Sequence, residues 1–249
     1  MALIHSLEKN GNILFKYRGQ IPVVLFLACI PTVYVTNYQC VDSNSILDLI
    51  LLITCAIFSI TGQVIRAIAI GMSSKHTSGR NTKEQVADAL NTKGIYSTVR
   101  HPLYLGNFFM WMGIVMYTYN IWFILVVSLL FWLYYERIMF AEERFLEKKF
   151  GDVYLNWSMK VPAFWPSFKN HEKTSIPFSL KTILRREYSG ISATIIGFVF
   201  VAFLRVWFTS GEVQWKAGQI IAVVIALLIS LVFRSLKHYT KMLYEADRS

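Results

Sequence analysis

Two short stretches of this chain carry side chains that could bind and activate a small molecule. Arg100, His101 and Pro102 lie in IYSTVRHPLYLGNFF, where a polar segment enters an apolar run, and Glu142 and Glu143 lie where another apolar run ends. Proline is tolerated at the first position of a helix, where free N–H groups favour an anion or a polar ligand. Arginine adds a fork suited to phosphate or carboxylate, and the glutamates supply the opposite charge. Such a site could hold a zwitterionic or cationic cofactor beside an anionic substrate.

A simpler interpretation of the same residues stays open. Arg100 would then be a basic anchor at a membrane surface, and His101 an ordinary interface residue. The paired glutamates would be part of a solvated helix end, as we interpret Glu147, which can pair with a neighbouring lysine in water.

The composition indicates a membrane protein. Of the 249 residues, 55% are hydrophobic and only 16% are charged, which departs from ordinary soluble usage. In so apolar a chain, a formal charge of +10 favours basic loops that face anionic lipid headgroups over nucleic-acid binding. Cys29, Cys40 and Cys55 lack metal-ligand or CxxC spacing, so they are expected to be small core residues, and no metal site is predicted. The polar, basic start of the chain predicts no cleavable signal peptide.

Apolar windows of spanning length predict an all-α, polytopic transmembrane bundle. Six windows qualify, of which the first and third are short: 21–36, 46–70, 102–117, 121–140, 190–209 and 217–233. Cytoplasmic loops carry an excess of Lys and Arg, and the segments 71–101 and 137–186 hold five and ten of them. Both termini and these two segments are therefore predicted to be cytoplasmic. Arg66 and Arg205, near span ends, are expected to extend to the interface.

Two of the predicted cytoplasmic segments have structure of their own. Thr82 and Gln85 stand at capping-box spacing, which predicts a short interfacial helix over 83–90. The fourth span is expected to continue about two turns beyond the membrane, until Gly151 ends the helix. That extension would carry Glu142 and Glu143 to the same membrane face as Arg100.

The combined stretches resemble a known family. GIYSTVRHPLYLG followed by AEERFLEKKFGDVYLNWSMKVPAFWP is similar to the isoprenylcysteine carboxyl methyltransferases and phospholipid methyltransferases, which are integral membrane enzymes. The shared pattern is R-H-P-x-Y-x-G, a paired Glu, F-G-x-x-Y and a Val-Pro loop, and Gly62 with Arg66 resembles a Gly-x-x-x-Arg element that precedes it. The resemblance covers roughly 46–168. The R-H-x-x-Y-x-G part alone also occurs in membrane sterol reductases that use NADPH, which leaves a reductase as an alternative.

The resemblance implies methyl transfer from S-adenosylmethionine at the cytoplasmic face, without a soluble nucleotide-binding domain. It implies catalytic roles for Arg100 and Glu143. It assigns cofactor binding to His101, Pro102, Tyr104, Leu105, Gly106, Glu142, Glu143, Tyr154, Val161 and Pro162. The substrate is expected to contact Arg66 and Arg100. From their position at the inner membrane surface, Arg185 and Arg186 are expected either to bind a phosphorylated lipid headgroup of the substrate or only to anchor the fifth span. For Tyr104 and Tyr154, a place in an interfacial aromatic belt is the competing interpretation.

We divide the chain into an N-terminal tail with the first span (1–45), a methyltransferase core with the cofactor site (46–168) and a basic segment with two further spans (169–249).

The substrate class depends on how the chain departs from the family. The long basic C-terminal part favours an anionic membrane lipid, and family members that methylate the phosphate of lipid A in bacterial inner membranes resemble this profile. Carboxyl methylation of an isoprenylcysteine is the alternative. An amine acceptor ranks lower because Arg100 would repel its ammonium form. The oligomeric state stays open.

Overall fold

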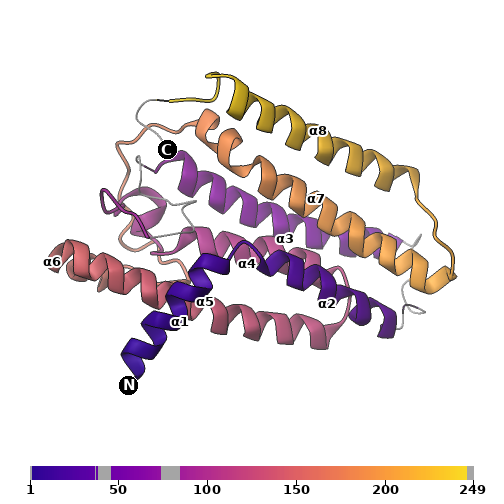
Figure 1. Ribbon diagram of the computed structural model, residues 1–249, viewed down its shortest axis with the longest axis horizontal. Coiled ribbons are helices and arrows are strands. Elements are labelled where there is room, and N and C mark those ends of the chain that lie inside the picture. Colours follow the sequence, from indigo (N-terminus) through magenta and orange to yellow (C-terminus); the bar gives the residue numbers. More distant parts are fainter. Residues whose placement is uncertain (1, 37, 39–45, 74–84, 246–249) are drawn as a thin grey trace.

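The computed structural model describes residues 2–36, 38, 46–73 and 85–245, and within these ranges the chain is helical without a strand (Figure 1). This confirms the predicted all-α fold class. The elements are α1 (Leu3–Tyr17), α2 (Ile21–Val35), α3 (Ile46–Gly71), the 3-10 turn η1 (Gly94–Ser97), α4 (Pro102–Met116), α5 (Ile121–Phe150), α6 (Asp152–Ser158), α7 (Leu180–Ser210) and α8 (Ala217–Tyr239).

All six apolar windows fold as helices, but not all of these helices are long enough to span a membrane. Among the described helices α3, α5, α7 and α8 qualify by length and composition, and α1 with α2, bent by 81°, would make a fifth span if counted together. The 15 residues of α4 give a helix of about 22 Å, shorter than a hydrocarbon core of about 30 Å. The structure therefore supports four or five spans where the sequence predicts six. Since α4 is packed against α3, α5 and α7, it can be apolar without facing lipid.

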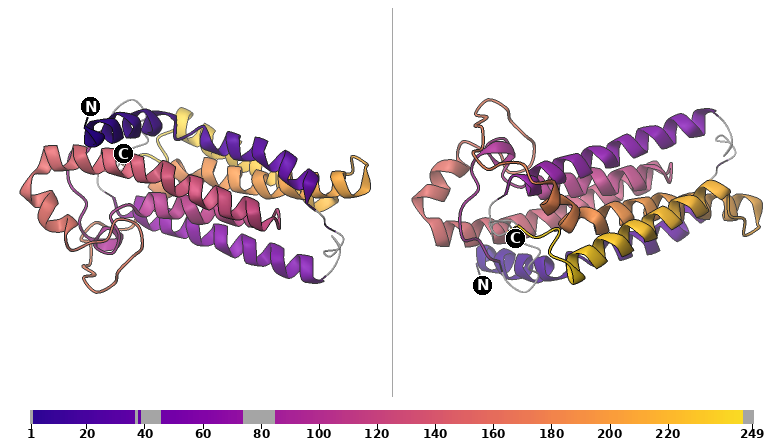
Figure 2. Two further views of the ribbon diagram at one scale, coloured as in Figure 1. Left: turned by 90° about the horizontal axis from the view of Figure 1, so that it is seen from below. Right: turned by 90° about the horizontal axis from the view of Figure 1, so that it is seen from above.

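The bundle places most of the polar loops at one end. The helices α2 to α5 alternate in direction, as do α7 and α8, so that α1, the start of α4, the end of α5 and the end of α8 lie together (Figures 1 and 2). The short helix α6 extends this end, and α1 lies against α5. By contrast, α8 packs mainly on α7 and exposes apolar side chains such as Ile220, Leu227 and Leu231, as expected for a lipid-facing helix. This arrangement agrees with termini on a common side of the membrane.

Small residues allow α3 and α4 to approach closely below the polar end. A Cβ on Gly62 would collide with the carbonyl oxygen of Gly106, and a Cβ on Gly106 would collide with the side chain of Arg66. The Ser59 hydroxyl donates a 2.7 Å hydrogen bond to the Met110 carbonyl across the same interface. Small residues and interhelical hydrogen bonds of this kind drive helix association in membranes.

Arg205 does not extend to the membrane interface as predicted, but is buried at the opposite end of the bundle. Its Nη2 lies 2.7 Å from Oδ1 of Asp48, and the two side chains are 5% and 11% exposed. Rings of Tyr38, Tyr117 and Tyr119 surround the guanidinium, 4.4 to 5.0 Å from its carbon. The Asp48 carboxylate and the three aromatic faces together replace the water that the Arg205 guanidinium loses, so that Arg205 is stable in a buried position.

The two predicted cytoplasmic helices have different outcomes. The extension of the fourth span is confirmed, since α5 continues to Phe150 and Gly151 ends it with φ of +53°. The interfacial helix over 83–90 is wrong from residue 85 on, where the chain is irregular, and residues 82–84 lie outside the described part. The Gln85 amide donates to Asn12 on α1 instead of capping a helix. Cys29 and Cys55 are buried as expected, while Cys40 lies outside the described residues.

Candidate functional site

The Arg-His-Pro triplet and the paired glutamates form one charged cluster. Nε and Nη2 of Arg100 donate to the two oxygens of Glu143, at 2.9 and 3.2 Å. The His101 Nε2 lies 2.8 Å from the Glu143 Oε1, and its Nδ1 lies 3.6 Å from Oε2 of Glu142. Pro102 begins α4, as its fixed φ favours, so His101 stands at the N-cap. The two stretches, which the sequence predicts to lie at the same membrane face, are thus in direct contact.

Arg100 also holds the loop that follows α6. Its Nη1 donates to the carbonyl oxygens of Ser158, at 2.6 Å, and Val161, at 2.9 Å. Backbone bonds extend the junction, because the N–H groups of Arg100 and His101 donate to the carbonyls of Pro162 and Ala163. The fork of the guanidinium thereby joins α5 to the Val-Pro loop.

His101 is held as an imidazolium. It is 5% exposed, and although burial disfavours the charged ring, hydrogen bonds and charge from Glu142 and Glu143 outweigh it and raise the pKa of His101 to about 9. The ring stacks on Tyr104 at 5.6 Å between centroids. At neutral pH the cluster is therefore close to charge balance, with Arg100 and His101 opposite the two carboxylates.

We expect this protonation to appear in the pH dependence of stability. Because the pKa of His101 is raised in the folded state, the protonated ring stabilises the folded protein. This stabilisation is fully present below the ordinary histidine pKa of about 6.5 and is lost as pH rises through about 9. Thermal unfolding in detergent should show wild type more stable than His101→Gln at pH 6, with the difference shrinking towards pH 10. A difference that stays constant over this range would contradict a charged His101.

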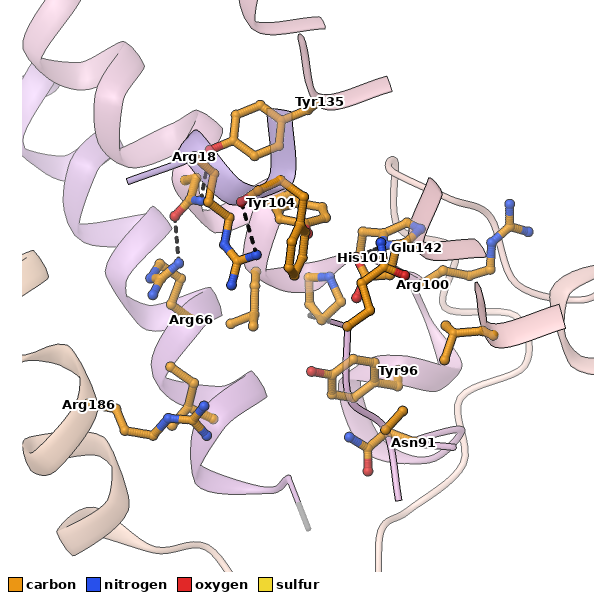
Figure 3. Close-up of a pocket in the computed structure, with 18 of the residues that line it drawn as sticks. Arg18, Arg66, Asn91, Tyr96, Arg100, His101, Tyr104, Tyr135, Glu142 and Arg186 are labelled. Carbon is orange, nitrogen blue, oxygen red and sulfur yellow. Dashed lines mark hydrogen bonds and ion pairs between the residues drawn. The ribbon is translucent and has the colours of Figure 1, made fainter. Parts of the chain in front are cut away.

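A cavity of about 410 Å³ opens beside this cluster. Figure 3 shows Arg66 and Arg186 on one side of it and His101, Glu142 and Tyr96 on the other. The volume falls in the range of small-molecule sites, roughly 300–1,000 Å³. Besides the charged side chains, its wall includes aromatic rings and the irregular segment 85–91.

Several polar atoms at this cavity suit a zwitterionic ligand. Among the described residues, Glu142 Oε2, the Tyr154 hydroxyl and the Trp157 indole N–H are buried without a hydrogen-bond partner, and all three residues line the cavity. Buried polar groups without partners are uncommon in proteins, which favours a bound molecule that supplies them. S-adenosylmethionine fits this set of groups. The Glu142 carboxylate can bind its ammonium group, and the Trp157 N–H and Tyr154 O–H groups can bind its other polar atoms.

The predicted site residues divide into those at the cavity and those behind it. Cavity-lining residues are His101, Pro102, Tyr104, Glu142, Tyr154, Arg66, Arg100 and Arg186. The others do not line it: Leu105, Gly106, Glu143, Val161, Pro162 and Arg185. Arg185, although adjacent to Arg186, faces a separate hollow with Lys237 and Lys241.

The residues behind the cavity act on those that line it. Leu105 packs in the hydrophobic core, Gly106 leaves room for the Arg66 side chain, and Glu143 holds both members of the Arg-His pair. Val161 and Pro162 contribute backbone carbonyls to the same junction. These residues do not line the cavity themselves, and their places in the motif are explained by the support that they give to the side chains of the cavity wall.

Arg66 does not extend to the membrane interface as the charge pattern predicts. Its Nε and Nη2 donate to both oxygens of Glu187 on α7, each at 2.7 Å, and Nη1 donates to Asn107. A buried acid from another helix supplies a partner that solvent would otherwise supply. Sequence reasoning missed Glu187 because the fifth apolar window begins at Gly190, whereas α7 begins ten residues earlier, at Leu180.

Other cavity residues also escaped the sequence analysis. Arg18 reaches the cavity from the end of α1, and Trp157 reaches it from α6. Neither belongs to the recognised pattern, and only the proximity of Trp157 to the F-G-x-x-Y element could have indicated it. Asn107, which follows Gly106 directly, was overlooked at the end of the R-H-P-x-Y-x-G element.

Comparisons with known proteins match this part of the chain. The family model for phospholipid methyltransferases matches residues 50–153. Protein-S-isoprenylcysteine O-methyltransferase of Schizosaccharomyces pombe is 36% identical over 114 residues, which are 44% of this chain and 47% of that protein. The nickel-cobalt-cadmium resistance protein NccN of Alcaligenes xylosoxydans xylosoxydans is 33% identical over 91 residues, 36% of this chain and 40% of that protein.

The third relative is the cobalt-zinc-cadmium resistance protein CzcN of Cupriavidus metallidurans, 34% identical over 79 residues, which are 32% of this chain and 36% of that protein. The chain therefore spans less than half the length of each of these relatives. No solved structure matches the chain significantly. The family description and the name of the first relative both denote methyltransferases. The matched region contains Arg66 and the whole cluster of Arg100, His101, Glu142 and Glu143, so this part of the chain is similar to phospholipid methyltransferases.

Proposed function

We propose that this protein is an integral membrane enzyme that transfers a methyl group from S-adenosylmethionine to an anionic oxygen of a membrane lipid or lipidated acceptor. The observation that carries the proposal is the cavity beside the family motif, where Glu142, Tyr154 and Trp157 hold buried polar atoms that have no hydrogen-bond partner among the described residues. The methyltransferase family match and the name of the first relative support the same reaction class.

Different residues of the cluster would bind different parts of the methyl donor or support the residues that do. When bound, S-adenosylmethionine supplies an activated methyl group on a positively charged sulfur. Glu142 offers a buried carboxylate oxygen for its ammonium group, and Tyr104 and Tyr154 supply aromatic surface at the same wall. Glu143 and Arg100 hold this wall together and help to exclude water. Positioning and exclusion of water are the main contributions that such a transfer requires.

The opposite wall favours an anionic acceptor. Arg66 and Arg186 line the cavity there, and Glu187 is the acidic partner of Arg66, which leaves an excess of positive charge. An ionised phosphate or carboxylate oxygen already carries a lone pair for attack, so no strong general base is needed. A lipid phosphate such as that of lipid A is our specific proposal, and the carboxylate of an isoprenylcysteine, the acceptor named for the first relative, is the alternative.

The membrane setting belongs to the same proposal. The loops around the cavity carry most of the Lys and Arg residues, so we assign them to the cytoplasmic face. A bacterial inner membrane would provide both the methyl donor from the cytoplasm and an anionic lipid. Residues 46–168 would form the core, flanked by 1–45 and 169–249, and residues from all three parts line the cavity.

Binding and labelling of the purified protein in lipid nanodiscs test this function. Calorimetry should detect S-adenosylmethionine and not NADPH, and methyl-labelled donor should transfer label to an acid-stable, organic-soluble lipid in a total membrane extract. Label on a lipid phosphate supports the specific acceptor, and label on a prenylated cysteine supports the alternative. Binding of NADPH without S-adenosylmethionine would instead identify a reductase and overturn the proposal.

A further inference from the structure

The first turns of α7 contribute to the cavity although they lie outside the family-matched region. That region ends at residue 153, whereas Arg186, Glu187, Ser189 and Gly190 line the cavity. The part of the chain that follows the recognised pattern is therefore a wall of the site as well as a membrane anchor.

Glu187 fixes the orientation of Arg66 in this wall. Its two carboxylate oxygens accept from Nε and Nη2 of Arg66 at 2.7 Å each, and Glu187 is only 2% exposed. Asn107 accepts from Nη1 at 2.5 Å, and its own amide donates to the Tyr135 hydroxyl at 3.2 Å. The chain of contacts joins α7, α3, α4 and α5, and every member lines the cavity.

The guanidinium of Arg66, held in this way, still has N–H groups that can donate hydrogen bonds to a ligand. An arginine has five N–H donors, and the bonds to Glu187 and Asn107 use three, which leaves two without a hydrogen-bond partner among the described residues. The bidentate bond occupies the Nε–Nη2 edge, so the remaining donors belong to Nη1 and Nη2. A planar pair of donors is suited to two oxygens of a phosphate or carboxylate.

Another arginine–carboxylate pair of the bundle has a different environment. Arg205 pairs with Asp48 beneath three tyrosine rings, and neither residue lines the cavity. About 27 Å of α3 separates Asp48 from Arg66. A purely structural ion pair thus exists in this chain without access to a ligand, whereas the Arg66–Glu187 pair faces one.

We propose that Glu187 is a positioning residue that presents Arg66 to the anionic group of the methyl acceptor, so that α7 helps to select an acceptor with an ionised phosphate or carboxylate. This inference rests on the proposed methyl transfer. Arg186 on the same turn adds positive charge to the acceptor side of the cavity. The methyl donor is held by the opposite wall and does not depend on Glu187.

The test compares Glu187→Gln with wild type in phosphatidylcholine nanodiscs. Two probe acceptors are used, dioleoyl phosphatidic acid for a lipid phosphate and N-acetyl-S-farnesylcysteine for a carboxylate, with total membrane lipid extract as a third. For each acceptor that wild type methylates, KM should rise about tenfold or more, the size expected for a disturbed charge-assisted hydrogen bond. The Kd of S-adenosylmethionine should stay within about twofold, since the described side-chain hydrogen bonds of Glu187 go to Arg66 and not to the residues assigned to the methyl donor. Glu187→Asp should restore part of the acceptor KM.

Asp48→Asn is the matched control, since it also removes one carboxylate from a buried arginine pair. Both variants should lower the unfolding temperature, but Asp48→Asn should leave acceptor KM unchanged. An unchanged KM in Glu187→Gln, or an equal rise in Asp48→Asn, overturns the inference while wild-type turnover still supports methyl transfer. Wild-type protein that binds S-adenosylmethionine but methylates no acceptor also overturns it, and wild type that binds no S-adenosylmethionine overturns the proposed function itself.

Discussion

Replacing Glu142 by Gln is expected to weaken the binding of S-adenosylmethionine by roughly 10- to 100-fold, the range that corresponds to a hydrogen bond with a charged group. The substitution keeps the shape of the side chain and removes its charge. Oε2 of Glu142 is buried at the cavity without a hydrogen-bond partner among the described residues, so it is the acceptor best suited to an ammonium group. The His101 Nδ1, at 3.6 Å, is its nearest described charge partner and holds it in place.

Calorimetry with S-adenosylmethionine and S-adenosylhomocysteine separates two roles for this carboxylate. The two ligands share the ammonium group, but only the first carries a charged sulfur. Equal losses in both affinities indicate contact with the ammonium, and a loss limited to S-adenosylmethionine indicates compensation of the sulfur charge. Glu147→Gln is the control, because Glu147 pairs with Arg144 on the same helix and does not line the cavity. Unchanged affinity for both ligands in Glu142→Gln would refute the assignment.

Arg100→Lys is expected to lower kcat/KM about 100-fold, equivalent to roughly 2.7 kcal/mol of transition-state stabilisation. The guanidinium contacts both oxygens of Glu143 and the carbonyls of Ser158 and Val161 at the same time. A lysine keeps the charge, but its single nitrogen cannot span these partners. The loop after α6 would then lose its junction with α5, and the wall that carries Tyr154 and Trp157 would loosen.

Separate measurements of turnover, of acceptor KM and of the affinity for S-adenosylmethionine show how Arg100 acts. If it holds the wall, Arg100→Lys weakens S-adenosylmethionine binding and lowers turnover together. If it contacts the acceptor directly, as the sequence pattern suggests, acceptor KM rises while the affinity for S-adenosylmethionine stays at the wild-type value. Arg144→Lys provides the control, since its partner Glu147 accepts a single hydrogen bond at 2.6 Å and no loop depends on it. Normal kinetics in Arg100→Lys would contradict both roles.

The sequence by itself determined the helical class and the cluster of opposite charges. Long apolar windows can only be satisfied as helices in a bilayer, because every backbone polar group needs a partner within the segment. Pro102 and Gly151 then mark a helix start and a helix end, and these bring Arg100 and Glu143 to one face. Such local signals depend on a few neighbouring residues and need no knowledge of the tertiary structure.

The tertiary structure alone decided which charges are buried and what lines the cavity. Arg66 and Arg205 look like interfacial residues in sequence, but each finds a carboxylate on a helix more than 100 residues away, a distance over which charge patterns carry no information. The segment after residue 85 is irregular because its partners lie on α1 and at the cavity, and its own capping pattern cannot outweigh them. Glu187 belongs to the site for the same reason, since packing of α7 on α3 sets it against Arg66.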